Sequence, residues 1–178
     1  WKIRKSPLCS QVYLHPGNAG THRLGFEALS SDAHTADAVS RAAKEKHVEL
    51  IVIGPETLLA QGYADTFRRE GFLVVGPDRA GAMLETSKVF AKEFMQRAGI
   101  PTAPFQVVDS YEAFEKAPLN RFPTVLKLDG LAAGKGVVIA NHKSEALVFG
   151  ERVWKSTEFG NGPHKVVMEE FLSGQEIS

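Results

Sequence analysis

The chain has 178 residues, of which 43% are hydrophobic and 24% charged, and its formal net charge is zero. These values are typical of a globular protein of one or two domains, and the balanced charge argues against binding to bulk nucleic acid or to an acidic membrane surface. Cys9 is the only cysteine, which excludes an internal disulfide and favours a reducing, cytoplasmic location. We expect neither a membrane span nor a signal peptide.

The first half of the chain alternates strands with helices. We expect strands at residues 11–14, 49–53 and 72–75, and helices at 35–46 and 63–70. The last two strands are almost continuous apolar runs, which are typical of parallel strands buried on both faces. This order predicts a doubly wound α/β unit, whose ligands lie outside the carboxyl ends of its strands. The turns at residues 15–21 and 54–56 fall at such ends.

The second half has a different character, and a smaller mixed α/β unit is expected from about Thr102 onwards. We expect helices at residues 86–98, from 109 and at 144–155, strands at 105–108, 123–126, 137–140 and 165–170, and a linker at 99–104. Asp109 and Glu112, three residues apart, predict a capping box at the start of the second of these helices. Lys92, in the first, is expected at the surface.

A glycine-rich loop joins the two middle strands of this unit. Residues 127–137 read Lys-Leu-Asp-Gly-Leu-Ala-Ala-Gly-Lys-Gly-Val. Glycines allow the backbone to fold closely around a ligand, and lysines supply positive charge, so the loop suits a polyphosphate. It is not a Walker A loop, because three residues separate Gly130 from Gly134 and a glycine follows Lys135. Taken alone, it is equally compatible with a glycine-rich hairpin turn.

Several segments together resemble an ATP-grasp enzyme, and more closely the phosphoribosylamine–glycine ligase family. The segments that carry the resemblance, in the family's order, are residues 16–21 (Pro-Gly-Asn-Ala-Gly-Thr), 52–56 (Val-Ile-Gly-Pro-Glu), 87–95 (Ser-Lys-Val-Phe-Ala-Lys-Glu-Phe-Met), 99–103 (Gly-Ile-Pro-Thr-Ala), 129–136 and 169–172 (Glu-Glu-Phe-Leu). The chain departs from the family at Leu58, where proline is usual, and at Leu128, where alanine or serine is frequent.

The resemblance implies an α/β fold in two parts. A Rossmann-like, doubly wound pre-ATP-grasp domain would occupy residues 1–84, with its first strand missing. The first part of an ATP-grasp α+β domain would occupy residues 85–178, with a connecting helix and linker at 85–104 and the small nucleotide-binding lobe at 105–172. We therefore expect an N-terminal fragment of a longer enzyme, which is inactive alone.

The resemblance also implies an activity, namely ATP-dependent ligation of glycine to 5-phosphoribosylamine through a glycyl phosphate, in purine biosynthesis. Magnesium or manganese would assist, with ligands beyond residue 178. Lys88, Lys127 and Lys135 would be catalytic and would contact the phosphates of ATP. Other ATP-binding residues would be Asp129, Gly130, Leu131, Ala132, Ala133, Gly134, Gly136, Val138, Glu169, Glu170, Phe171, Leu172 and Glu176. Phosphoribosylamine would contact Asn18, Gly20, Thr21 and Glu56.

Each of these assignments has a plainer alternative. Lys127 fits a surface-facing position in an alternating strand, and Lys88 fits the solvated face of its helix. Glu169 and Glu170 fit an ordinary acidic strand end, and the N-terminal turn residues fit a need for backbone shape alone. The six histidines have no zinc-ligand spacing. Two further functions stay open, namely another ATP-grasp ligase such as a biotin carboxylase, and a nucleotide-binding module without catalysis.

Overall fold

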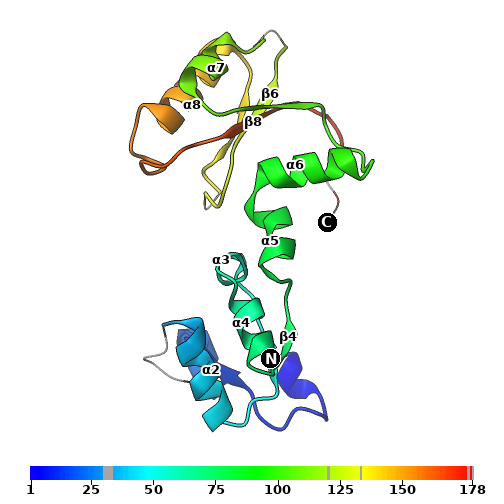
Figure 1. Ribbon diagram of the computed structural model, residues 1–178, viewed down its shortest axis with the longest axis vertical. Coiled ribbons are helices and arrows are strands. Elements are labelled where there is room, and N and C mark those ends of the chain that lie inside the picture. Colours follow the sequence, from blue (N-terminus) through cyan, green and yellow to red (C-terminus); the bar gives the residue numbers. More distant parts are fainter. Residues whose placement is uncertain (30–33, 120, 133, 176, 178) are drawn as a thin grey trace. The chain divides into compact units, whose positions relative to one another are not determined.

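The computed structural model describes residues 1–29, 34–119, 121–132, 134–175 and 177. The chain divides into two compact units, Trp1–Arg79 and Ala80–Ser178, each of which mixes helices and strands (Figure 1).

The first unit contains two short parallel sheets. Its elements in chain order are the 3-10 helix η1 (Ile3–Lys5), β1 (Tyr13–Leu14), α1 (Ala19–Arg23), β2 (Glu27–Ala28), α2 (Ala36–Glu45), β3 (Leu50–Val52), α3 (Glu56–Ala60), α4 (Tyr63–Arg69) and β4 (Leu73–Val75). Strand β1 pairs with β2, and β3 pairs with β4, both in parallel. Helices α2 and α4 supply Val39, Ala43 and Phe67 to a buried cluster against one face of the β3–β4 pair, as expected for an α/β unit.

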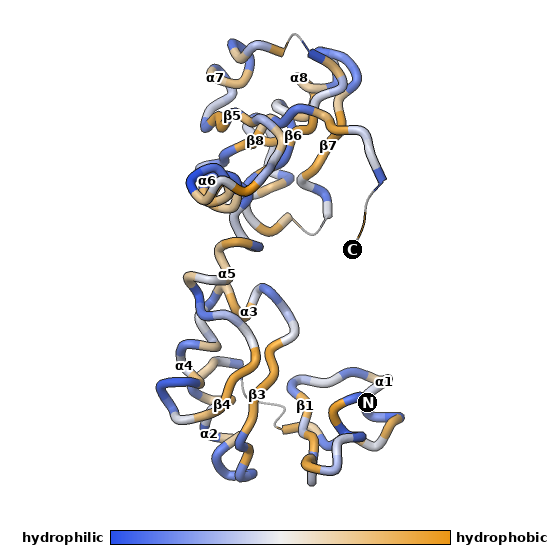
Figure 2. Tube along the Cα trace, turned by 90° about the vertical axis from the view of Figure 1, so that its right-hand side faces the viewer, coloured by the Kyte–Doolittle hydropathy of each residue, from blue (hydrophilic) through white to orange (hydrophobic). Residues whose placement is uncertain are grey.

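The other face of β3 and β4 differs from the prediction. Leu50, Val52, Leu73 and Val75 are 49%, 49%, 70% and 54% exposed, although both runs were predicted to be buried on both faces. Alternate side chains of a strand point to opposite faces, and α2 and α4 cover only the face that carries Ile51. Both strands are strongly hydrophobic (Figure 2). Within the described part of this unit, one apolar face therefore lies open.

Two of the predicted turns in this unit continue into short helices. The turn after β1 ends in α1, where Asn18 accepts a hydrogen bond from the backbone of Thr21 and the Thr21 side chain accepts one from the backbone of Asn18. Glu56 is the first residue of α3 and not part of a turn, and Pro55 precedes it at the N-cap position. Each helix starts a few residues after the end of a strand, so helix starts lie on the predicted ligand side of the unit.

The second unit is built on one antiparallel sheet. Its elements are α5 (Arg79–Thr86), which begins at the last residue of the first unit, α6 (Lys88–Arg97), β5 (Phe105–Val108), α7 (Tyr111–Lys116), β6 (Thr124–Leu128), β7 (Val137–Ala140), α8 (Lys143–Trp154) and β8 (Val166–Glu170). The strand order is β5-β8-β6-β7, which Figure 2 shows across the sheet. Helices α7 and α8 pack over one face, where Phe114, Leu126, Phe149 and Val166 are at most 1% exposed.

Even-numbered and odd-numbered side chains of this sheet face opposite ways. Leu126, Leu128, Val166 and Met168 belong to the core under α7 and α8. The odd-numbered residues of the same strands point to the other face, which we call the open face. Lys127 and Glu169 lie on it, and α6 contributes side chains at one end of it.

Two helix starts differ from the sequence prediction. Ser110, and not Asp109, is the N-cap of α7, because its side chain accepts the backbone N–H of Ala113. The helix predicted at residues 86–98 starts at Lys88, because Thr86 is the last residue of the preceding helix α5 and Ser87 caps α6 by accepting the N–H of Phe90. Both are serines with a short acceptor side chain, and tertiary geometry decided which acceptor was used.

Candidate functional site

The glycine loop is anchored at its first residue to the start of α6. Asp129 accepts hydrogen bonds from the Ser87 hydroxyl at 3.1 and 3.3 Å and from the backbone N–H of Val89 at 3.1 Å. A carboxylate at a helix N-terminus is favourable, because the first N–H groups of the helix have no partner within it. The backbone N–H of Asp129 also donates to Lys165 O at 2.8 Å. Asp129 was predicted as an ATP ligand, but its side chain joins the loop to α6.

Lys88 reaches the same loop from the first turn of α6. Its Nζ donates to Gly130 O at 2.8 Å, and the residue is half-buried. Lys88 therefore does not lie on a fully solvated face of α6, which was the plainer alternative. The geometry brings two of the predicted phosphate-binding elements together, since a lysine and a glycine-loop carbonyl are in direct contact.

The loop itself is longer than an ordinary hairpin. It spans residues 129–136, whereas typical hairpin loops have about two to five residues. Gly130 and Gly134 have φ values of +92° and +79°, which a side chain would make unfavourable. Gly136 is needed for a different reason, because a Cβ there would lie 2.7 Å from that of Ala132. Of the predicted residues, Ala133 lies outside the described part of the chain.

Lys135 is exposed within the loop, and its positive charge affects Glu158 in the segment after α8. The pKa of Glu158 is held below its usual range, mainly by the hydrogen bond from Arg152 and to a smaller extent by the positive charge of Lys135. Lys135 also closes the turn through its backbone, because its N–H donates to Ala132 O at 2.9 Å. Leu131, next to Gly130, is 46% exposed. The loop thus carries an accessible cation.

Lys127 stands on the open face beside a buried carboxylate. Its Nζ lies 2.9 Å from Oε1 and 3.0 Å from Oε2 of Glu169. The side chain of Glu169 is 6% exposed, whereas that of Lys127 is 30% exposed. Lys92 was predicted at the surface, but its side chain is only 7% exposed and its Nζ lies 3.0 Å from Glu169 Oε2. Sequence reasoning missed Lys92 because alternate burial on α6 depends on β8, which lies far along the chain.

Val138 differs from the other predicted nucleotide contacts in its position. It pairs with Leu126 and packs against the core under α7 and α8, on the face opposite Lys127. The strand neighbours Val137 and Ile139 are on the open face, where they are 45% and 50% exposed. The register between β6 and β7 determines which face Val138 occupies, because a shift by one residue moves a side chain to the other face of a sheet.

The end of β8 carries the remaining predicted ATP contacts. Glu169 is occupied by two lysines, whereas Glu170 is exposed and its backbone N–H donates to Pro104 O at 3.0 Å. Phe171 and Leu172 follow, 37% and 63% exposed. Glu176, another of the predicted ATP-binding residues, lies outside the described residues. An accessible acid and an apolar side chain are therefore adjacent at this strand end.

The predicted substrate residues of the first unit are used partly for local structure. Asn18 and Thr21 cap α1 through each other's backbone, and a Cβ on Gly20 would lie 3.2 Å from Asn18 Oδ1. This geometry explains their residue types without a ligand. Glu56 is different, because its side chain is exposed at the start of α3.

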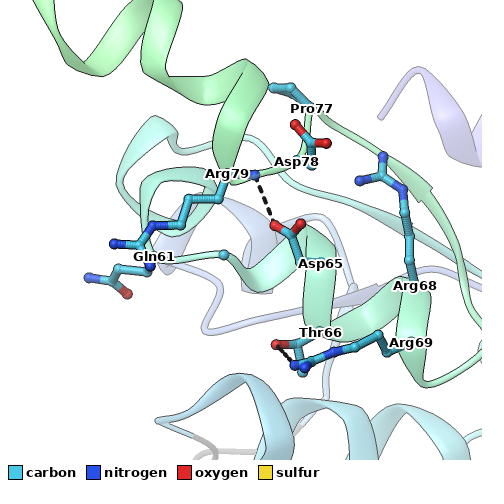
Figure 3. A pocket seen from close by; sticks show the side chains of 9 residues that line it. Gln61, Asp65, Thr66, Arg68, Arg69, Pro77, Asp78 and Arg79 are labelled. Atoms are coloured by element: carbon cyan, nitrogen blue, oxygen red, sulfur yellow. Dashed lines mark hydrogen bonds between the residues drawn. The ribbon is translucent and has the colours of Figure 1, made fainter.

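A cavity of about 830 Å³ also opens in the first unit, between α4 and the turn after β4 (Figure 3). Arg68, Arg69, Arg79 and Asp65 are among the residues that line it. Several of their polar groups are used internally: Arg79 N donates to Asp65 at 2.8 Å, and Arg68 Nη2 donates to Gly76 O at 2.5 Å. None of the predicted site residues lines this cavity, so it is not the site that the sequence predicts.

Two features are absent from the part of the chain that the structure describes. In residues 1–29, 34–119, 121–132, 134–175 and 177, no three His, Cys, Asp or Glu side chains are grouped closely enough to hold a metal ion. Over the same residues, no helix has both the length and the apolar character that crossing a bilayer requires.

Two family models together match the whole chain. The family model for the phosphoribosylglycinamide synthetase N domain matches residues 1–85, and the model for the ATP-grasp (A) domain of the same enzyme matches residues 86–178. The phosphoribosylamine–glycine ligase of Chlorobaculum tepidum is 45% identical over 183 residues, which cover 100% of this chain and 43% of that protein. The human trifunctional purine biosynthetic protein adenosine-3 is 41% identical over 100% of this chain and 18% of its own length.

Solved structures agree with these matches. The crystal structure of phosphoribosylamine–glycine ligase from Thermotoga maritima has a TM-score of 0.70 and 37% identity, covering 93% of this chain and 39% of that one. A biotin carboxylase from Campylobacter jejuni, at 23% identity and a TM-score of 0.62 over 83% of this chain and 34% of its own, shares the fold. The chain spans less than half the length of these relatives. Its α/β first unit and its ATP-grasp second unit, together with both family matches, show that this chain belongs to the phosphoribosylglycinamide synthetase family.

Proposed function

We propose that the protein to which this chain belongs ligates glycine to 5-phosphoribosylamine, with cleavage of ATP to ADP and phosphate. The observation that carries the proposal is the arrangement around the glycine loop. Lys88 holds the loop carbonyl of Gly130, Lys135 is exposed within the loop, and Lys127 stands on the open face. Three cations in and around one glycine-rich segment suit the charge of a triphosphate.

The same face offers a surface for the base of ATP. Val137 and Ile139 are accessible apolar side chains on it, and Leu172 is exposed just beyond β8. Glu170 supplies an accessible acid and backbone groups for the edge of adenine. We therefore propose Val137 and Ile139 in place of Val138 as apolar contacts. Glu169 is proposed to act through Lys127 rather than on adenine.

The reaction requires alignment and charge compensation more than a protein nucleophile. A carboxylate oxygen of glycine attacks the γ-phosphorus, the bond to the bridging oxygen of ADP breaks, and glycyl phosphate forms. The amine of phosphoribosylamine then attacks the carbonyl carbon and expels phosphate, with loss of a proton from nitrogen. Lys88, Lys127 and Lys135 would offset the negative charge of the transferring phosphoryl group, and the loop would exclude water from the acyl phosphate.

A divalent cation, magnesium or manganese, is part of this proposal. When bound, it would neutralise phosphate charge as a Lewis acid. We propose that its ligands come from the rest of the enzyme, as the family resemblance implies. Asn18, Gly20, Thr21 and Glu56 are proposed contacts of phosphoribosylamine, with Glu56 the one whose accessible carboxylate suits its hydroxyl or amine groups. A cytoplasmic location is proposed for the activity.

The test measures phosphate release by the full-length protein. Release is expected only when ATP, glycine and phosphoribosylamine are all supplied, and Lys127→Met is expected to lower kcat/KM by about 10²- to 10³-fold. Lys116→Met, which removes an exposed lysine of α7 from the same unit, serves as the matched control and should change the rate less than about twofold. Turnover that needs bicarbonate and not glycine would instead identify another ATP-grasp activity.

A further inference from the structure

Lys92 is a buried cation whose hydrogen bonds and ion pair are made with protein groups. Its Nζ donates to Thr102 Oγ1 at 2.7 Å and to Ala103 O at 3.2 Å, and it lies 3.0 Å from Glu169 Oε2. Two of the three N–H donors of the ammonium group are thus used in hydrogen bonds, and its charge is paired with the carboxylate of Glu169. The ring of Phe105 lies 5.5 Å from the same Nζ. Lys92 is therefore held in one position and is not available to a ligand.

Glu169 connects this buried lysine to the accessible one. One carboxylate lies between two ammonium groups, with Lys92 Nζ 3.0 Å from Oε2 and Lys127 Nζ 2.9 Å from Oε1. The directed hydrogen bond from Lys127 goes to Oε2, at 3.0 Å, and Oε1 receives none in spite of the short distance. Glu169 therefore takes one directed hydrogen bond from Lys127.

The charges of the three residues add up to one positive charge. If Lys92 were absent, Glu169 and Lys127 would form a neutral pair, and a buried carboxylate would draw the whole ammonium of Lys127 towards itself. With Lys92 present, the charge of Glu169 is shared. The excess positive charge then resides on Lys127, whose side chain is 30% exposed on the open face, whereas that of Lys92 is 7% exposed.

We propose that Lys92 is a positioning residue for the binding of a nucleoside triphosphate. It fixes and neutralises Glu169, and so leaves Lys127 as a net cation, in a defined position, for the polyphosphate. This inference rests on the proposed function, in which Lys127 contacts the phosphates. It assigns to the buried lysine of α6 a role that requires no contact with the ligand.

The experiment compares ATP with adenosine, which lacks the phosphates, as ligands of the full-length protein in titration calorimetry. In Lys92→Met, affinity for ATP is expected to fall about ten- to hundredfold, the effect of weakening one charge-assisted contact. Affinity for adenosine should stay within about twofold. General damage to the fold would weaken both ligands alike, so an equal loss, or no loss of ATP affinity, would overturn the proposal. Lys116→Met is again the matched control.

A second comparison does not depend on the folding of the single variant. Lys92 matters, on this proposal, only while Glu169 is charged. ATP affinity of the double variant Lys92→Met/Glu169→Gln should therefore equal that of Glu169→Gln within about threefold, because no buried carboxylate is left to neutralise. A further tenfold loss in the double variant would overturn the proposal. Failure of the unaltered protein to bind ATP would refute the proposed function itself, before any variant is compared.

Discussion

The anchor of the glycine loop gives the sharpest test of the structure. Asp129→Ala removes the acceptor of the Val89 N–H at the first turn of α6, and also the partner of the Ser87 hydroxyl. A hydrogen bond to a charged group contributes about 1.5–3 kcal/mol, and the favourable placement of a carboxylate at a helix N-terminus about 0.3–1 kcal/mol more. Asp129 is only half-buried, so water replaces part of this contribution. We expect the start of α6 to open more easily by about 2 kcal/mol.

Hydrogen exchange measured by mass spectrometry follows this opening directly. A change of about 2 kcal/mol corresponds to roughly thirtyfold faster exchange of the amides at the start of α6. Asp129→Asn keeps an oxygen acceptor but loses the charge, and should accelerate exchange only about fivefold. Amides of α8, on the other side of the sheet, serve as an internal reference.

Asp109→Ala is the matched control, since this aspartate is exposed and Ser110 caps the helix beside it. Its effect on exchange in α6 should be less than about twofold. The reasoning is wrong if Asp129→Ala accelerates exchange in α6 no more than Asp109→Ala does. It is also wrong if Asp129→Asn and Asp129→Ala have the same effect, because the charge would then contribute nothing.

Three further changes probe the core, the loop and the acid response of the second unit. Leu126→Ala, at a side chain that is 0% exposed in β6, should lower the free energy of unfolding by about 2–5 kcal/mol in urea titrations, and a loss under 1 kcal/mol would contradict the packing. Gly136→Ala places a Cβ 2.7 Å from another methyl group of the loop and should cost about 1–3 kcal/mol, whereas Gly162→Ala, which meets open space, should be nearly neutral. The pKa of Glu145 is lowered, chiefly by the hydrogen bond from the Asn141 backbone, so its contribution to stability is present above the usual carboxyl pKa and is lost as pH falls through the lowered value. The urea midpoint of Glu145→Gln should accordingly lie below that of the unaltered protein at neutral pH and converge with it in acid, and a constant gap would contradict this.

Much of the fold follows from local patterns. The apolar runs before and after the glycine loop become β6 and β7, and the amphipathic segment at residues 35–46 becomes α2, Ala36–Glu45. Periodicity of 2 and of 3.6 residues reports such elements reliably, because it records which side chains must leave water. The first residue of a helix does not follow from local patterns in the same way. Asp109 and Ser110 are both good N-cap residues, and the structure shows that Ser110 is the one used.

The sequence alone predicts the glycine loop between two strands, and the order of its segments along the chain carries the resemblance to the family. Local patterns suffice for these features, because glycines and flanking apolar runs mark a loop between two strands whatever the rest of the chain does. The tertiary structure alone decided the face of each side chain. Lys92 is buried because β8 brings Glu169 beneath α6, and Val138 faces the core because of its register with Leu126. Both outcomes depend on pairing between segments far apart in the chain, and a local pattern contains no information about that pairing.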